Sequence, residues 1–433
     1  MADNKRIVFY ALSFLFLTGI ALIGNTLART DSFWLFVSFI FIFGIYLAIW
    51  KIAEIKFLFW LGILARVSLF LALPALSDDL YRFLWDGLLL KNGNNPFAEL
   101  PAFYLNQRTS GLSSELFDLL NSPNYFTIYP PLNQAIFWLA VTISEKWLVA
   151  AGVIRLFLFA ADLGTFHYLK KLLIKKGMNE NLAFLYFLNP LVILEGVGNL
   201  HFESLVIFFL TYSLYHFYSS QTFKSALGMG LAIGTKLLPL IFLPFFFFKD
   251  LSQKKITFTL ISILIAILVL SPLYSPEFVA GMRTSLSLYF LNFEFNASLF
   301  FLAKKVGFYL TGGNEIETIG PILSGISFIS ILSISLVGYV KKWSPEKVML
   351  FVLTGYLLFA TTVHPWYILP LLMLGVLSRY IYPIMWSLMI FVTYMGYSPG
   401  GYSLPSIWIA TEYFVVFLAF IFNNQLKKWL IIF

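Results

Sequence analysis

Apolar windows long enough to cross a bilayer recur along the whole chain. A helix needs about 20 mostly apolar residues to span the hydrocarbon core. The first three such windows are Ile7–Ile23, Phe33–Trp50 and Phe57–Leu76. The first lacks a small-residue cleavage site before the next apolar stretch, so we interpret it as a retained helix and not as a signal peptide. The pattern predicts an all-α polytopic membrane protein with about 12 to 14 transmembrane helices.

Composition supports this class. Of the 433 residues, 60% are hydrophobic and only 12% are charged, which is more apolar surface than a soluble domain can bury. The net charge of +8 would suggest nucleic acid in a soluble protein. In a membrane protein, Lys and Arg accumulate in cytoplasmic loops, so we expect membrane lipid and not nucleic acid as the partner. Cysteine is absent, which excludes disulfides and a thiol nucleophile. We expect one membrane domain over residues 1–433.

The basic residues predict an orientation. Lys5 and Arg6 place the N-terminus inside, and residues 1–50 form an N-terminal hairpin. The third helix then exits, so residues 77–147 become a large outer loop, and residues 273–314 form a second outer segment. With this orientation most acidic residues lie outside, and this asymmetry supports the predicted topology.

Two apolar stretches have an uncertain path. Pro131–Ser144 is short, about 14 residues, and suits an interfacial or re-entrant helix. Leu148–Leu169 would then cross inward and deliver four lysines to the cytoplasm. Ala226–Phe248 has lysines on both flanks, which predicts two half-helices that enter and return, broken at its glycines and prolines. The lysines that carry this argument are Lys170, Lys171, Lys175, Lys176, Lys224, Lys249, Lys254 and Lys255. The alternative, in which both stretches cross once, remains open.

The most informative polar segment begins the outer loop. Asp78 and Asp79 are adjacent, and Arg82 and Asp86 follow. One aspartate can take a proton from an acceptor hydroxyl while the other holds a metal or orients a sugar. The structural alternative is a solvated loop in which Ser77 and Asp78 cap a helix containing residues 81–90.

Three ionisable residues lie inside apolar stretches: Arg155, Asp162 and Lys236. Charge within a membrane is costly and faces a cavity or a partner. Arg155 and Asp162 are seven residues apart, about two helical turns, and we interpret them as a structural pair. Lys236 lies beside the proposed helix break, where it can bind an anionic phosphate that arrives from the bilayer.

Further candidates lie at expected outer helix ends. His201, with Glu203 nearby, is a candidate metal ligand or hydrogen-bond donor to a phosphate, and His364 is followed by Trp366 and Tyr367. Tyr129 precedes two prolines, and a turn at the membrane surface is its simpler interpretation. A divalent cation such as Mg or Mn, if one is required, would bind Asp78, Asp79 and Glu203, although so few ligands are weak evidence for a metal.

These motifs together resemble the integral-membrane GT-C glycosyltransferases, and most of all the bacterial mannosyltransferases that use polyprenyl-phosphate-mannose. The resemblance begins with Asp78-Asp79-Leu-Tyr-Arg-Phe-Leu-Trp-Asp-Gly and Tyr129-Pro130-Pro131. It continues through Arg155, Ala161-Asp162-Leu163, Asn189-Pro190, Gly198–Glu203, Thr235-Lys236 and His364-Pro365-Trp366-Tyr367. One departure is that the acidic motif follows the third helix and not the first, which the N-terminal hairpin explains.

The resemblance implies a reaction. A sugar, mannose by preference, passes from a polyprenyl-phosphate donor to the hydroxyl of a glycan or glycolipid acceptor, with inversion. Asp78 or Asp79 is the implied catalytic acidic residue. Arg82, Lys236 and His364 are candidates for the leaving phosphate, which fixed cations must stabilise. Asp86, Tyr129, His201, Glu203, Trp366 and Tyr367 complete the implied donor site.

Two other functions fit parts of the pattern. A lipid or solute transporter or flippase also has broken helices and intramembrane charge, but it does not need a long acidic and aromatic outer loop. A polysaccharide polymerase or ligase has similar chemistry and differs in its lipid-diphosphate donor.

Overall fold

The computed structural model describes residues 2–52, 55–248, 253–291 and 293–430. Two compact units form from interleaved parts of the chain. Unit 1 comprises Met1–Leu76, Leu158–Tyr218 and His364–Phe433, and unit 2 comprises Ser77–Phe157 and Ser219–Val363. Helices dominate both units. The strands of the described part are β1 (Tyr397–Ser398) and β2 (Gly401–Tyr402), a short antiparallel pair.

Membrane-length helices confirm the all-α polytopic class. In the described residues, five helices are long and apolar enough to cross a bilayer, or six if one bent pair counts as a span. They are α1 (Ala2–Asn25), α2 (Ser32–Ile52), α8 (Trp147–Lys175), α13 (Gln253–Leu270) and α16 (Ile316–Val340). The predicted 12 to 14 crossings exceed this number because several apolar windows form helices that are broken or shorter than a full span.

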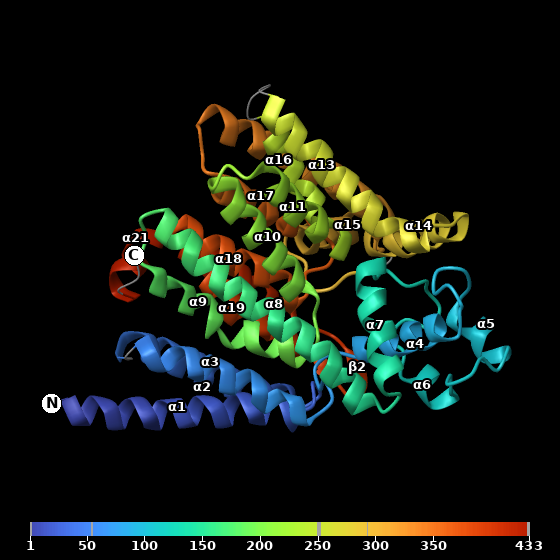
Figure 1. Cartoon of the computed structure of the whole chain (residues 1–433), viewed down its shortest axis with the longest axis horizontal. Coiled ribbons are helices and arrows are strands. Elements are labelled where there is room, and N and C mark those ends of the chain that lie inside the picture. Colours follow the sequence, from blue (N-terminus) through green and yellow to red (C-terminus); the bar gives the residue numbers. More distant parts are fainter. Residues whose placement is uncertain (1, 53–54, 249–252, 292, 431–433) are drawn as a thin grey trace. The chain divides into compact units, whose positions relative to one another are not determined.

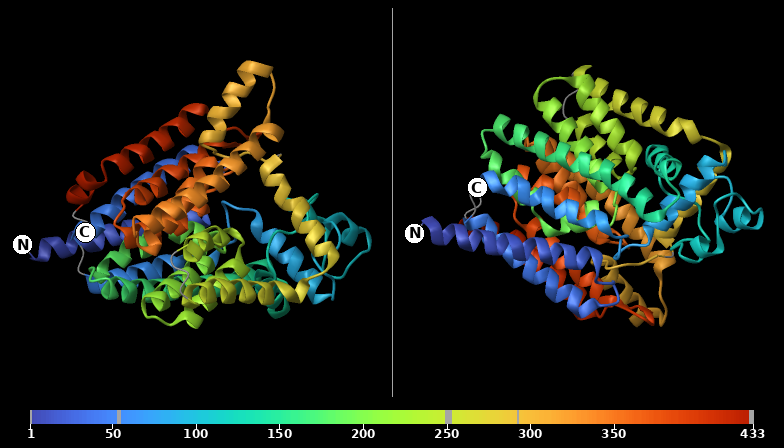
Figure 2. Two further views of the ribbon diagram at one scale, coloured as in Figure 1. Left: turned by 90° about the horizontal axis from the view of Figure 1, so that it is seen from above. Right: turned by 60° about the horizontal axis from the view of Figure 1, so that its bottom comes forward.

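Unit 1 begins with the predicted N-terminal hairpin. Helices α1 and α2 lie side by side (Figures 1 and 2). Gly19 permits this close approach, because a Cβ atom there would lie 2.6 Å from Cγ1 of Ile42. The rings of Phe39 and Phe391 stack at 3.6 Å and join α2 to the C-terminal part of the unit. The hairpin is therefore part of the unit's core.

The other elements of unit 1 are mostly short. They are α3 (Ile55–Val67), η1 (Ser68–Leu71), η2 (Glu180–Leu182), α9 (Ala183–Phe187), η3 (Val192–Gly198), α10 (Glu203–Tyr218), η6 (Pro365–Ile368), α18 (Leu369–Ser378), α19 (Tyr382–Met389), η7 (Ile390–Gly396), α20 (Ser406–Ile421) and α21 (Asn423–Leu430). The segments Glu180–Phe187 and Val192–Gly198 form the bent pair, with an angle of 66° between them. Pro190 lies at this break, where proline removes a helix hydrogen bond.

A buried ion pair joins two helices of unit 1. Nε of Arg66, on α3, lies 2.6 Å from Oδ2 of Asp162 on α8, and both side chains are fully buried. Tyr186 donates a 2.9 Å hydrogen bond to Oδ1 of the same carboxylate. The residue in contact with Asp162 is therefore Arg66, which the sequence did not indicate, and the predicted structural pair of Arg155 and Asp162 stays a prediction. Two turns along one helix separate those residues by about 10 Å, whereas the neighbouring helix α3 brings Arg66 into contact.

Unit 2 opens with the helices of the predicted outer loop. These are α4 (Asp79–Lys91), α5 (Pro101–Asn106), α6 (Ser114–Asp118) and α7 (Pro131–Ile143). Helix α7 has 13 residues, which confirms the short helix predicted for Pro131–Ser144. It packs tightly on α4 at Gly87, where a Cβ atom would lie 2.6 Å from the Phe137 carbonyl oxygen. This contact fixes the distance between the two loop helices.

The second half of unit 2 contains the predicted helix break. Helix α11 (Thr222–Thr235) ends before Lys236, and the chain resumes in η4 (Leu238–Phe242) and α12 (Leu243–Phe248). The break is confirmed, but Gly230 and Gly234 serve a different purpose from the predicted one. Both let α11 pack closely against Ile265 and Val269 of α13. The re-entrant path stays a prediction, and of its flanking lysines Lys249 and the side chains of Lys254 and Lys255 lie outside the described residues.

The predicted second outer segment, residues 273–314, is helical. It contains the end of η5 (Ser271–Leu273), α14 (Pro276–Leu291) and α15 (Leu299–Thr311). Helix α17 (Pro345–Phe359) completes unit 2.

Candidate active site

Asp79 begins helix α4 and is held by two side chains of the following loop. The Tyr129 hydroxyl donates a 2.9 Å hydrogen bond to Oδ2, and the Asn121 amide donates a 2.7 Å hydrogen bond to Oδ1. The aspartate remains partly exposed. A carboxylate can accept about four hydrogen bonds, and the partial exposure of Asp79 makes it accessible to a substrate hydroxyl.

Asp78 occupies the N-cap position of α4, but its side chain makes no capping hydrogen bond. The Ser77 hydroxyl instead accepts a 3.3 Å hydrogen bond from the backbone N–H of Asp79. The predicted helix over residues 81–90 is confirmed, while the predicted capping by the Asp78 side chain is wrong. Both aspartates are partly exposed at the start of the same helix, so both stay candidates for the catalytic role.

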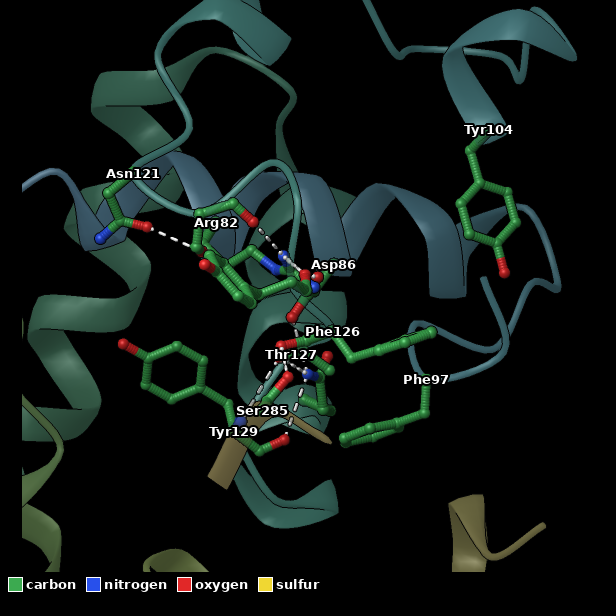
Figure 3. Close-up of polar contacts among 12 residues, drawn as sticks. Arg82, Asp86, Phe97, Tyr104, Asn121, Phe126, Thr127, Tyr129 and Ser285 are labelled. Atoms are coloured by element: carbon green, nitrogen blue, oxygen red, sulfur yellow. Dashed lines mark hydrogen bonds and ion pairs between the residues drawn. The ribbon is translucent and has the colours of Figure 1, made fainter. Parts of the chain in front are cut away.

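A buried ion pair lies one turn further along α4. Nε of Arg82 is 2.8 Å from Oδ1 of Asp86, and both side chains are almost fully buried. The Arg82 guanidinium also donates to the carbonyl oxygens of Ser122, at 3.3 Å, and Tyr125, at 2.9 Å. Figure 3 shows Arg82 and Asp86 between Asn121 and Tyr129. Arg82 therefore holds the loop whose side chains hold Asp79.

The surroundings of Asp86 shift the pKa of its carboxyl group in two opposite directions. Burial raises the pKa of Asp86, and the charge of Arg82 together with hydrogen bonds from Thr127 and Gln134 offsets part of that rise. The amide of Gln134, on α7, donates a 2.8 Å hydrogen bond to Oδ2. Such a buried charged group is tolerated only while its partners remain in place. The structure favours a positioning role for Arg82 and Asp86, and their direct contact with the donor stays a prediction.

Lys236 lies where α7 meets the end of α11. The Asn133 side chain, in the first turn of α7, donates a 3.1 Å hydrogen bond to the carbonyl of Thr235. Lys236 follows with an extended backbone and a partly exposed side chain. Asp79, Asn121 and Tyr129 form one hydrogen-bonded set, here called the Asp79 group. Tyr129 lies four residues before Asn133, so the start of α7 connects this group to the end of α11, where Lys236 lies. These groups belong to one unit.

In unit 1 the predicted histidines meet on one tryptophan. The rings of His201 and Trp366 stack with centroids 3.7 Å apart, and the rings of His364 and Trp366 stack at 4.4 Å. Tyr367 contacts His364 edge to face at 5.3 Å. The structure thus brings His201, predicted from one segment, to His364, Trp366 and Tyr367, predicted from another. Glu203 begins α10 and is buried, and its role stays a prediction.

Glu195 is a residue that our sequence analysis missed. It is fully buried in the π-helical segment η3, and its Oε2 lies 3.2 Å from Nδ1 of His201. The Tyr394 hydroxyl donates a 2.6 Å hydrogen bond to Oε1. The signal was available, because Glu195 lies inside an apolar stretch, as Asp162 and Lys236 do. Short π-helical segments are frequent at functional sites, and this one orients the imidazole of His201.

Metal binding gains no geometric support. In the residues that the structure describes, no group of three or more His, Asp or Glu side chains forms a candidate metal site. The set of Asp78, Asp79 and Glu203, with Mg or Mn, stays a prediction.

The helical membrane fold and the loop-borne aspartates are consistent with the predicted GT-C class of integral-membrane glycosyltransferases, and a family match supports this class. The model of the MptA_B family, described as alpha-(1->6)-mannopyranosyltransferase, N-terminal domain, matches residues 12–249. This match covers more than half of the 433 residues, so the chain belongs to that family. It includes Asp78, Asp79, Tyr129, His201 and Lys236 but ends before His364. No curated protein matches the chain.

Family membership makes the protein a membrane glycosyltransferase of an alpha-mannosyltransferase family, with a sugar donor and an acceptor as substrates. The predictions of class and family are confirmed.

Proposed function

We propose that this protein transfers mannose from a polyprenyl-phosphate donor to a hydroxyl of a glycan or glycolipid acceptor, with inversion. The proposed location is the outer face of a bacterial plasma membrane. The observation that carries the proposal is Asp79, held between Tyr129 and Asn121 at the start of a loop helix, within the segment that the family model matches.

Asp79 is the proposed general base. The acceptor hydroxyl needs a positioned group to take its proton as it attacks the anomeric carbon. Two hydrogen bonds fix the Asp79 carboxylate, and its partial exposure leaves it accessible. Asp78 is adjacent and is the competing candidate. Asparagine variants of each residue separate the two roles.

Lys236 is the proposed partner of the leaving phosphate in unit 2. The leaving group becomes a dianion, and a fixed cation stabilises such charge. The end of α11 and the hydrogen bond from Asn133 to Thr235 determine the backbone position of Lys236. In unit 1, the stacked rings of His201, Trp366 and His364 are the proposed donor-binding group for the sugar or the lipid chain. Each group is tested by its own variants.

The family description supports a specific stereochemistry. An alpha-linked product that forms by inversion requires a donor in which mannose is beta-linked to phosphate. The same description makes a 6-hydroxyl of mannose the proposed nucleophile. A beta-linked polyprenyl phosphomannose and an acceptor that ends in mannose are therefore the expected substrates.

The test is an assay of the purified full-length protein with radiolabelled polyprenyl-phosphate-mannose, and in parallel with polyprenyl-diphosphate sugars. We expect alpha-linked product and free polyprenyl phosphate from the monophosphate donor only. Asp79→Asn should lower kcat by at least about 100-fold, the lower end of a general base contribution.

Turnover with diphosphate donors would support the polymerase or ligase function. Donor movement without bond cleavage would support a flippase. Release of polyprenyl phosphate that persists in both Asp78→Asn and Asp79→Asn would overturn the catalytic assignment.

A further inference from the structure

A pocket that the proposed reaction does not use lies within unit 1. Its volume is about 600 Å³, which falls in the range of small-molecule sites. It opens between the start of α3 and the end of α8, and it also touches Glu180 in η2 and Phe184 in α9. The start of α3 and the end of α8 lie at the same end of unit 1 (Figure 1). The residues of the Asp79 group do not line it.

The lining changes from apolar to cationic along both helices. On α8, Lys170 lies four residues after Phe166, and on α3, Lys56 lies three residues before Phe59. At 1.5 Å per residue, the cations are displaced by about 5 Å along each helix axis from the aromatic rings. Helix α8 is one of the membrane-length helices, and its lysines lie in its last two turns. The pocket is therefore at a boundary between hydrocarbon and water, with its cations toward water.

The apolar part of the pocket is already packed. The rings of Phe59 and Phe166 stack at 5.6 Å, and Phe166 and Phe184 lie 4.9 Å apart. About two turns before Lys170 along α8, Asp162 is paired with Arg66 and accepts a hydrogen bond from Tyr186. The aromatic wall thus has a defined shape, and the charges available to a ligand are those of the lining lysines.

The charges of the lining favour an anion. Lys56, Lys170 and Lys171 face one acid, Glu180, so the lining carries a net charge of +2. Nζ of Lys170 lies 2.9 Å from Glu180, and both side chains are partly exposed, so this pair is weak. An anionic ligand would compete with Glu180 for Lys170. Lysine binds phosphate as a compact point charge.

We propose that this pocket binds an anionic phospholipid. Its phosphate would contact Lys56, Lys170 and Lys171, and one acyl chain would lie along Phe59 and Phe166. Basic pockets between membrane helices bind such headgroups. A lipid is favoured over free phosphate because the aromatic wall borders a membrane-length helix and matches a chain attached to the headgroup. The site is independent of the proposed transfer reaction.

The experiment is native mass spectrometry of the full-length protein in detergent, titrated with dioleoyl-phosphatidylglycerol. Phosphatidylcholine, inorganic phosphate and polyprenyl phosphate are the comparison ligands. Each basic residue near a membrane surface contributes about fivefold to the affinity for an anionic lipid. We expect Lys170→Gln/Lys171→Gln to weaken phosphatidylglycerol binding by about 25-fold. Lys175→Gln is the matched control, because this exposed lysine of the same helix end does not line the pocket.

Glu180→Gln gives a change of opposite sign. It removes the carboxylate that competes for Lys170 and keeps every lysine, so binding should strengthen by about fivefold. This variant keeps the proposal testable if the double variant does not fold. The proposal is overturned if the double variant and Lys175→Gln bind phosphatidylglycerol equally, or if Glu180→Gln weakens binding. It is also overturned if millimolar phosphate displaces the lipid, or if polyprenyl phosphate binds there in preference.

Discussion

The Tyr129 hydroxyl donates a 2.9 Å hydrogen bond to the carboxylate of Asp79, which lies 50 residues earlier in the chain. In the sequence these residues belong to two separate short motifs, and a surface turn was the simpler interpretation of Tyr129. In the structure they form one group, because α7 packs on α4 at Gly87 and brings the Tyr129 segment back to the start of α4.

Tyr129→Phe should therefore impair catalysis without unfolding the protein. A hydrogen bond to a charged group contributes about 1.5–3 kcal/mol, so we expect kcat to fall by about 10- to 100-fold with a smaller change in donor KM. The measurement is steady-state transfer at saturating donor. Tyr125→Phe, an exposed tyrosine of the same loop, is the control and should retain activity. Equal activity of the two variants would exclude a functional role for the Tyr129–Asp79 hydrogen bond.

Arg82→Gln should destabilise the loop and not only the site. Removing one partner of a buried ion pair costs about 3–5 kcal/mol, and Arg82 additionally holds two loop carbonyls. We expect a large fall in the thermal unfolding midpoint of the purified protein. Lys91→Gln is a matched control on the same helix, because the Lys91–Glu145 pair is exposed and contributes at most about 1 kcal/mol. A midpoint as high in Arg82→Gln as in Lys91→Gln would contradict the positioning role.

Asp86 should give the stability a pH dependence of definite sign. Burial raises the pKa of Asp86 in the folded state above its ordinary value of about 3.9. Between these two values the folded state binds more protons than the unfolded state, so stability falls as the pH rises through that window. We expect the unfolding midpoint of the parent protein to decrease relative to that of Asp86→Asn as the pH rises from the ordinary value through the raised one. A difference that is constant over pH would show that Asp86 does not titrate in this way.

Sequence periodicity predicted the class and several element bounds well, because long apolar windows with polar ends have few alternative structures in a membrane. The N-terminal hairpin, the short helix over residues 131–144 and the break beside Lys236 all appear in the structure. The glycines before that break were interpreted as helix breakers, yet Gly230 and Gly234 are packing positions against α13. The sequence pattern alone does not show which helix will pack against these glycines.

The sequence did not show which residues contact the buried charged side chains. Asp162 was paired with Arg155 on its own helix, whereas Arg66 reaches it from α3. Glu195 was overlooked, although it lies in an apolar stretch, and its carboxylate contacts His201. Arg66 lies 96 residues before Asp162, and only the packing of helices determines that pairing. Glu195 lies six residues before His201, and the π-helical segment η3 determines their contact.

Trp366 should be the most sensitive residue of the stacked group in unit 1. It lies against both His201 and His364, and each aromatic pair contributes about 0.5–1.5 kcal/mol. We expect Trp366→Leu to lower kcat/KM for the donor by at least about tenfold, and Trp366→Phe to lower it by less. Trp34→Leu replaces an exposed tryptophan on α2 and should be neutral. Full activity of Trp366→Leu would remove this group from the donor site.

The orientation in the membrane is testable with single cysteines, because the natural chain has none. Leu200 is a poor labelling position, since it is fully buried and has a positive φ of 65°. Gln107 and Lys175 are exposed and should label from outside and inside respectively.

Lys224, also exposed, and Lys254 flank the broken helix. Both should label from inside if α11 and α12 enter and return. Labelling of one from each side would show that this stretch crosses the membrane. Outside labelling of both Gln107 and Lys175 would show that residues 131–144 cross the membrane. Inside labelling of Gln107 with outside labelling of Lys175 would invert the proposed orientation and place the Asp79 group on the cytoplasmic face.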